Sequence, residues 1–183
     1  MLNSPFHKLS KSSEKRLTII LLIFLIGFIV LMRFFDAPLK NEVSPNGIVS
    51  FELAKTVSNS EAILNSWDTN AIQSAKNSMM ADFLFLIVYS FFISLIVHRL
   101  NNRVWEKGFI YQIGILICWG VFLAALFDVI ENIALVRLLY GDLQQLWSSI
   151  AYYFAMMKFG ILLFGVSFIL MSFVVLPLKK RMN

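Results

Sequence analysis

The sequence predicts an all-α fold, a bundle of four transmembrane helices with a helical extracytoplasmic segment between helices one and two. Of its 183 residues, 58% are hydrophobic, and 18 are phenylalanine. These apolar residues gather into four blocks, each close to the ~20 residues that a helix needs to cross ~30 Å of hydrocarbon. A soluble domain of this length would alternate apolar and polar positions. We therefore expect residues 1–183 to form a single membrane domain.

The first block, LTIILLIFLIGFIVLM, follows a basic tail, as the core of a secretory signal does. However, it is longer than a usual signal core, and RFFDAPLK after it has no small-x-small cleavage site. We therefore expect an uncleaved first span at about residues 17–35.

The polar segment 36–80 comes next and contains its own helix signals. SPNG at 44–47 predicts a turn, and Ser60 is a candidate N-cap for EAILNSW. Asp68 or Thr69 can cap the helix that follows. We expect short helices on the membrane surface, the last continuing unbroken into the second span. A lid packed on the bundle is the simpler interpretation, and a gate or docking surface is the alternative.

The remaining apolar blocks predict spans at about 81–99, 109–139 and 148–178. Two short polar connectors, HRLNNRVWEK and GDLQQLW, join them.

Basic residues indicate the topology. Ten of the sixteen Lys and Arg residues fall on one side of a four-span chain, in the two tails and the first short connector: Lys8, Lys11, Lys15, Arg16, Arg99, Arg103, Lys107, Lys179, Lys180 and Arg181. The positive-inside rule then predicts a multi-pass protein of the cytoplasmic (inner) membrane with both termini in the cytoplasm. Anionic lipid accounts for the net charge of +5 without nucleic acid as a partner. A homo-oligomer or a larger membrane complex remains a candidate assembly.

Scarce cysteine and histidine argue against several classes of membrane enzyme. Cys118 is the single cysteine, so an electron relay through cysteine pairs is excluded. With only His7 and His98, haem-carrying bundles and zinc-dependent hydrolases lack ligands. No cofactor motif is evident; a divalent cation stays an open alternative that no dedicated ligand set supports.

A layer of charge inside the apolar blocks is the most informative feature. Counted from the nearest cytoplasmic anchor, each span places an ionisable residue 17 or 21 positions away, roughly 25 to 32 Å along a helix. The residues are Arg33 in the first span, Asp82 in the second, Asp128 and Glu131 beside Asn132 in the third, and Lys158 in the fourth. We expect them to meet at one depth near the outer leaflet.

Helical spacing predicts that these groups face inward. Asp128, Glu131 and Asn132 follow i, i+3 and i+4 and share one face. Small residues lie beside them and beside Lys158, as at helix–helix contacts. A charge facing lipid would cost at least ~2.5 to 3.5 kcal/mol. The candidate ligand- or ion-binding residues are therefore Asp82, Asp128, Glu131, Asn132, Lys158 and Arg33, with no catalytic residue assigned.

Four interpretations of this layer stay open. It can be a structural clamp in which Lys158 bridges Asp128 and Asp82, or a site for an ion, a proton, or a small or lipid ligand. It can also be an enzyme site with paired carboxylates, or the contact surface of a complex subunit. The lipoprotein signal peptidases share the outline of four spans and two outer aspartates, but their surrounding motifs are missing here.

Several segments together resemble a group of uncharacterised small bacterial four-helix integral membrane proteins. The segments are GIVSFELAKT, Trp67, DFLF and ALFDVIENIAL, and the most specific element is Asp-x-x-Glu-Asn at 128–132. The resemblance covers residues 47–139 and implies no reaction, ligand or partner.

Overall fold

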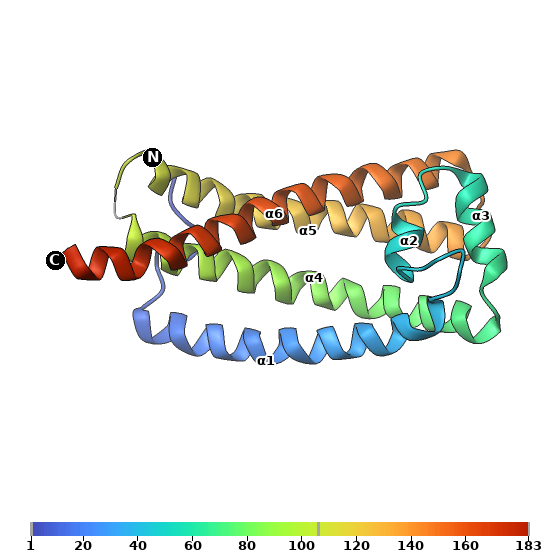
Figure 1. Cartoon of the computed structure of the whole chain (residues 1–183), viewed down its shortest axis with the longest axis horizontal. Coiled ribbons are helices and arrows are strands. Elements are labelled where there is room, and N and C mark those ends of the chain that lie inside the picture. The colour runs from blue at the N-terminus through green and yellow to red at the C-terminus, as the bar shows by residue number, and fades with distance from the viewer. Residues whose placement is uncertain (1, 106, 183) are drawn as a thin grey trace.

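Four long helices run side by side along the molecule in the computed structural model, which describes residues 2–105 and 107–182 (Figure 1). They are α1 (Lys11–Asp36), α4 (Thr69–Val104), α5 (Phe109–Leu139) and α6 (Gln145–Met182). Each is long and apolar enough to cross a membrane. Every regular element of the described residues is helical, which confirms the all-α class and the four apolar helices.

The helix bounds confirm that the polar segment 36–80 continues unbroken into the second apolar helix. The helix α4 begins at Thr69 and runs unbroken to Val104. Asp68 caps it, because its carboxylate accepts a hydrogen bond from the Ala71 amide at 2.7 Å.

The segment 37–68, called the cap below, covers one end of the bundle (Figure 1). It contains η1 (Ala37–Leu39), α2 (Ile48–Glu52) and α3 (Val57–Ser66). The Trp67 indole anchors it by donating hydrogen bonds to the Leu39 carbonyl and the Ser44 hydroxyl, both at 3.0 Å. The prediction of Ser60 as an N-cap was wrong. Thr56 caps α3, and Ser60 lies buried inside the helix with its hydroxyl 2.9 Å from that of Ser148.

An apolar core joins the cap to the helices beneath it. Cap side chains, among them Leu39, Phe51 and Trp67, pack with buried residues of α4, α5 and α6. The rings of Phe51 and Trp67 meet edge to face with centroids 5.4 Å apart. Burial of this surface holds α2 against the bundle, and α2 ends at Glu52.

The first helix is the least enclosed of the four. It lies along α4 (Figure 1) and contains no buried residue. Large apolar side chains such as Ile23 and Phe34 are exposed on it, as expected for a surface in contact with lipid.

Both chain ends lie at the end of the bundle opposite the cap (Figure 1). This arrangement places the basic tails and the connector between α4 and α5 together. Of the basic C-terminal tail, the side chains of Lys180 and Arg181 lie outside the described residues.

The closest helix–helix approach at a glycine is between α4 and α5. A Cβ on Gly114 would overlap the buried carboxamide of Asn101, which donates to the Tyr111 carbonyl at 2.9 Å. By contrast, a Cβ on Gly27 of α1 would meet nothing within 4 Å.

We therefore expect Gly114→Ala to lower the free energy of unfolding by about 1–2 kcal/mol, because the buried Asn101 carboxamide must shift and lose its hydrogen bond to the Tyr111 carbonyl, or α4 and α5 must move apart. Gly27→Ala is the matched control and should be neutral or slightly stabilising. Denaturant titration of the purified variants measures both values. Equal effects of the two substitutions would contradict the packing argument.

Candidate functional site: a buried carboxylate–lysine cluster

Lys158 of α6 is the centre of the site. Its Nζ lies 2.7 Å from Oδ1 of Asp128 and 2.8 Å from Oε2 of Glu131, both on α5. The i, i+3 spacing of the two acids on one helix face lets them reach the same ammonium group. Lys158 itself is 6% exposed, so all three charges are removed from solvent.

Glu52 of the cap is the functional candidate that the sequence did not reveal. Its Oε2 lies 3.8 Å from Nζ of Lys158, and that oxygen has no hydrogen-bond partner among the described residues. Burial raises the pKa of the Glu52 carboxyl, and the nearby Lys158 charge opposes that rise only in part. Its sequence context, IVSFELA, carries only a weak amphipathic pattern that gives no sign of a partner on α6.

Two further hydrogen bonds extend the cluster to α4. The Tyr89 hydroxyl donates to Oδ2 of Asp128 at 2.8 Å. The Asn132 amide donates to Oδ2 of Asp82 at 2.5 Å. Asp82 is therefore bound by Asn132. In the clamp interpretation Lys158 bridges Asp128 and Asp82, whereas in the structure it bridges Asp128 and Glu131.

Arg33 is not part of the cluster, which corrects the prediction for the first span. It is exposed on α1, and no ion pair links it to a carboxylate among the described residues. The physical reason is the position of α1, which contributes no buried residue to the bundle. The fourth element of the cluster is the cap helix α2, which supplies Glu52 in place of Arg33.

The charge balance of this cluster is its main chemical property. The cluster combines four carboxyl groups, those of Glu52, Asp82, Asp128 and Glu131, with one lysine, and all five residues are between 0% and 9% exposed. A fully ionised cluster would bury uncompensated negative charge, which costs several kcal/mol for each ion. The folded protein therefore favours the uptake of protons or of another cation at this position.

No group of three or more His, Cys, Asp or Glu side chains within the described part of the chain is arranged to hold a metal ion. The Lys158 ammonium lies between the carboxylates and already neutralises part of their charge.

Comparison of the chain with protein-family models, with curated proteins and with solved structures found no match in any of the three. The functional argument therefore depends on the geometry of the cluster.

Proposed function

We propose that the chain is a multi-pass protein of the inner membrane, with both termini cytoplasmic, whose buried cluster takes up protons or a small cation. The observation that carries this proposal is the excess of four buried carboxyl groups over one lysine. Ionisable groups within membrane-spanning helices mark ion or proton pathways more often than they act as simple supports. Three of the carboxyl groups and the lysine come from such helices.

The size of the ligand follows from the burial of the site. Glu52 and the apolar cap core cover Lys158. Oxygens of the other three carboxylates are engaged: Asp128 by Lys158 and Tyr89, Glu131 by Lys158, and Asp82 by Asn132. A proton or a small cation reaches such a group with little rearrangement. A lipid or peptide substrate would require the cap to move away, so an enzyme site is the weaker candidate. A contact surface for a partner subunit is weaker for the same reason.

Asp128 provides the test, since it contacts both Lys158 and Tyr89. We expect acid or a small cation to raise the melting temperature of the wild-type protein in detergent, and Asp128→Asn to reduce that gain by at least about half. The measurement is thermal unfolding at pH 5 to 9 and in a series of sodium, potassium and magnesium chloride.

Glu42→Gln is the matched control, because Glu42 is exposed in the cap and belongs to no ion pair among the described residues. It should respond to acid and salts as the wild type does. If Asp128→Asn, Glu131→Gln and Asp82→Asn lower stability without changing any response to pH or cations, the cluster is a clamp and the proposal is wrong. Co-purification of a stoichiometric partner from native membranes would favour the subunit alternative.

A further inference from the structure

A second feature lies at the opposite end of the bundle from the cap. A cavity of about 580 Å³ opens there between α1, α4 and α6. Its lining combines four cations, one carboxylate, and polar and apolar side chains: Lys11, Glu14, Lys15, Ile96, Arg99, Leu100, Asn102, Arg103 and Phe173. The carboxylate–lysine cluster has no residue in it.

The charges of this basic cavity come in two helical pairs. Lys11 and Lys15 are spaced i, i+4 on α1, and Arg99 and Arg103 are spaced i, i+4 on α4. The two residues of each pair therefore lie on one face of their helix, and both faces line the same cavity. Among the lining residues that the structure describes, four cations stand against one carboxylate, that of Glu14, so this part of the lining is electropositive.

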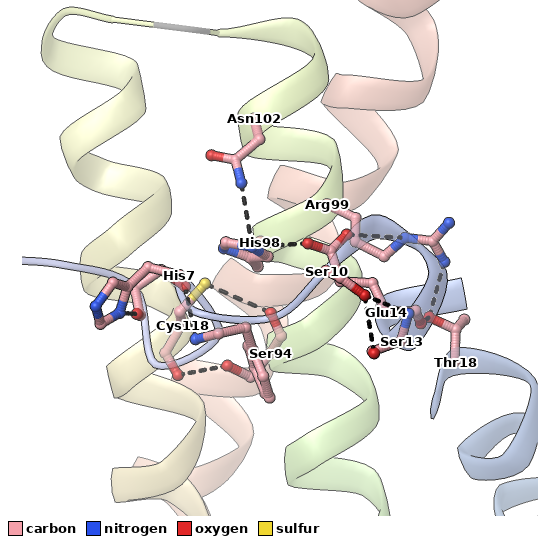
Figure 2. A network of polar contacts seen from close by, with 12 residues as sticks. His7, Ser10, Ser13, Glu14, Thr18, Ser94, His98, Arg99, Asn102 and Cys118 are labelled. Carbon is pink, nitrogen blue, oxygen red and sulfur yellow. Dashed lines mark hydrogen bonds and ion pairs between the residues drawn. The ribbon is translucent and has the colours of Figure 1, made fainter. Parts of the chain in front are cut away.

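One of the four cations is held in place by the protein. Arg99 donates from Nη1 to the Thr18 hydroxyl at 2.7 Å, and its Nε lies 3.8 Å from Oε2 of Glu14 (Figure 2). Glu14 also lies 3.5 Å from Nε2 of His98, which is buried. These contacts fix the position of Glu14 and Arg99 at the wall of the cavity.

The other three cations keep their charge available. Lys11, Lys15 and Arg103 are exposed, and no ion pair joins them to a carboxylate within residues 2–105 and 107–182. A phosphate group between the two pairs would contact ammonium and guanidinium groups, and guanidinium binds phosphate well through paired hydrogen bonds.

The apolar part of the lining indicates what accompanies the phosphate. Ile96 and Leu100 of α4 and Phe173 of α6 form this part, and the Phe173 side chain is 55% exposed. All three lie in helices long and apolar enough to span a membrane, where acyl chains are the surrounding solvent. A ligand with a phosphate headgroup and hydrocarbon tails can contact the basic residues with the headgroup and the apolar residues with a tail.

We propose that this cavity binds an anionic phospholipid, with the phosphate headgroup between Lys11, Lys15, Arg99 and Arg103 and an acyl chain along Ile96, Leu100 and Phe173. Under the positive-inside rule, the cavity faces the cytoplasmic leaflet, where juxtamembrane cations attract anionic lipid. The lipid would tie α1, which contributes no buried residue, to α4 and α6. This inference is independent of the function proposed for the carboxylate–lysine cluster.

Native mass spectrometry of the full-length protein measures lipid binding directly. The probes are phosphatidylglycerol and phosphatidylcholine with identical acyl chains, added to the protein in detergent. We expect phosphatidylglycerol to bind at least about tenfold more tightly. The double variant K15A/R103A should weaken phosphatidylglycerol binding roughly 10- to 30-fold, because each cation near the headgroup contributes a factor of about ten or less to the affinity.

The control variant K8A/K107A removes the same charge at the same end of the chain. Lys8 and Lys107 are exposed and do not line the cavity. Binding by this variant should stay within about twofold of the wild type, since diffuse surface charge contributes less than direct contact. An equal loss in both variants would show attraction to the surface as a whole and overturn the site.

A third experiment distinguishes a phospholipid ligand from a soluble phosphate ligand. Inorganic phosphate at millimolar concentration should leave bound phosphatidylglycerol in place, because it gains nothing from the apolar wall. Phe173→Ala should weaken phosphatidylglycerol binding about two- to tenfold through the lost acyl contact. Displacement by inorganic phosphate, together with an unchanged affinity in Phe173→Ala, would assign the cavity to a soluble phosphate ligand and overturn the proposal.

Discussion

Lys158→Met is expected to lower the free energy of unfolding by about 3–5 kcal/mol at neutral pH, the cost of removing one partner from a buried ion pair. Methionine keeps much of the side-chain volume, so the loss reports charge more than packing. Without the ammonium group, Asp128 and Glu131 lose their nearest cation, at 2.7 and 2.8 Å. Titration with denaturing detergent, followed by circular dichroism, measures the change.

A double-substituted background separates charge from packing. In D128N/E131Q the carboxylates next to Lys158 are neutral, so the further cost of Lys158→Met should fall to about 1–2 kcal/mol. Lowering the pH should also reduce the cost in the single variant, because protons then neutralise the same carboxylates. Lys107→Met, an exposed site at the other end of the bundle, should have almost no effect. A penalty that is unchanged in D128N/E131Q would refute the electrostatic explanation.

Glu52→Gln is expected to stabilise the protein at alkaline pH, because it removes a poorly compensated buried charge. The pH dependence follows from the raised pKa of Glu52 in the folded state. A carboxyl group whose pKa is raised by folding stabilises the folded state. This contribution is fully present below the unfolded pKa of 4.5 and is lost as the pH rises through the folded pKa. The advantage of the variant over the wild type should therefore grow from pH 4.5 upward.

Parallel unfolding titrations of wild type and variant between pH 4 and pH 9 measure this difference. Glu61→Gln is the control, since Glu61 is exposed on α3 and should keep the wild-type profile. A constant difference between Glu52→Gln and wild type over the whole range would mean that Glu52 carries the same charge in the folded and unfolded states. Glu52 would then take no part in the uptake of protons or cations by the cluster.

The candidate site could be predicted in part, and the reason is local geometry. Helical spacing alone places Asp128, Glu131 and Asn132 on one face, and the structure has all three buried. The depth count placed Lys158 at the same level as these acids, and its ammonium group contacts Asp128 in the structure. In contrast, depth along α1 placed Arg33 level with the others but did not show which way α1 faces.

The residues that were missed depend on contacts between distant segments. Glu52 belongs to the polar segment 36–80, and it reaches Lys158 because Phe51 and Trp67 pack the cap against α5 and α6. His98 of α4 is likewise buried, and it lies against Glu14 of α1. Neither contact leaves a periodic signal in the chain.

The amino-acid sequence by itself determined the four apolar helices, their order and the inward face of α5, because chain hydrophobicity and helical periodicity are local properties. Tertiary structure alone decided that α1 stays outside the charged group, that the cap brings Glu52 to Lys158, and that two basic helix faces enclose one cavity. Such outcomes depend on how helices pack against one another, and that choice is made by contacts between residues far apart in the chain.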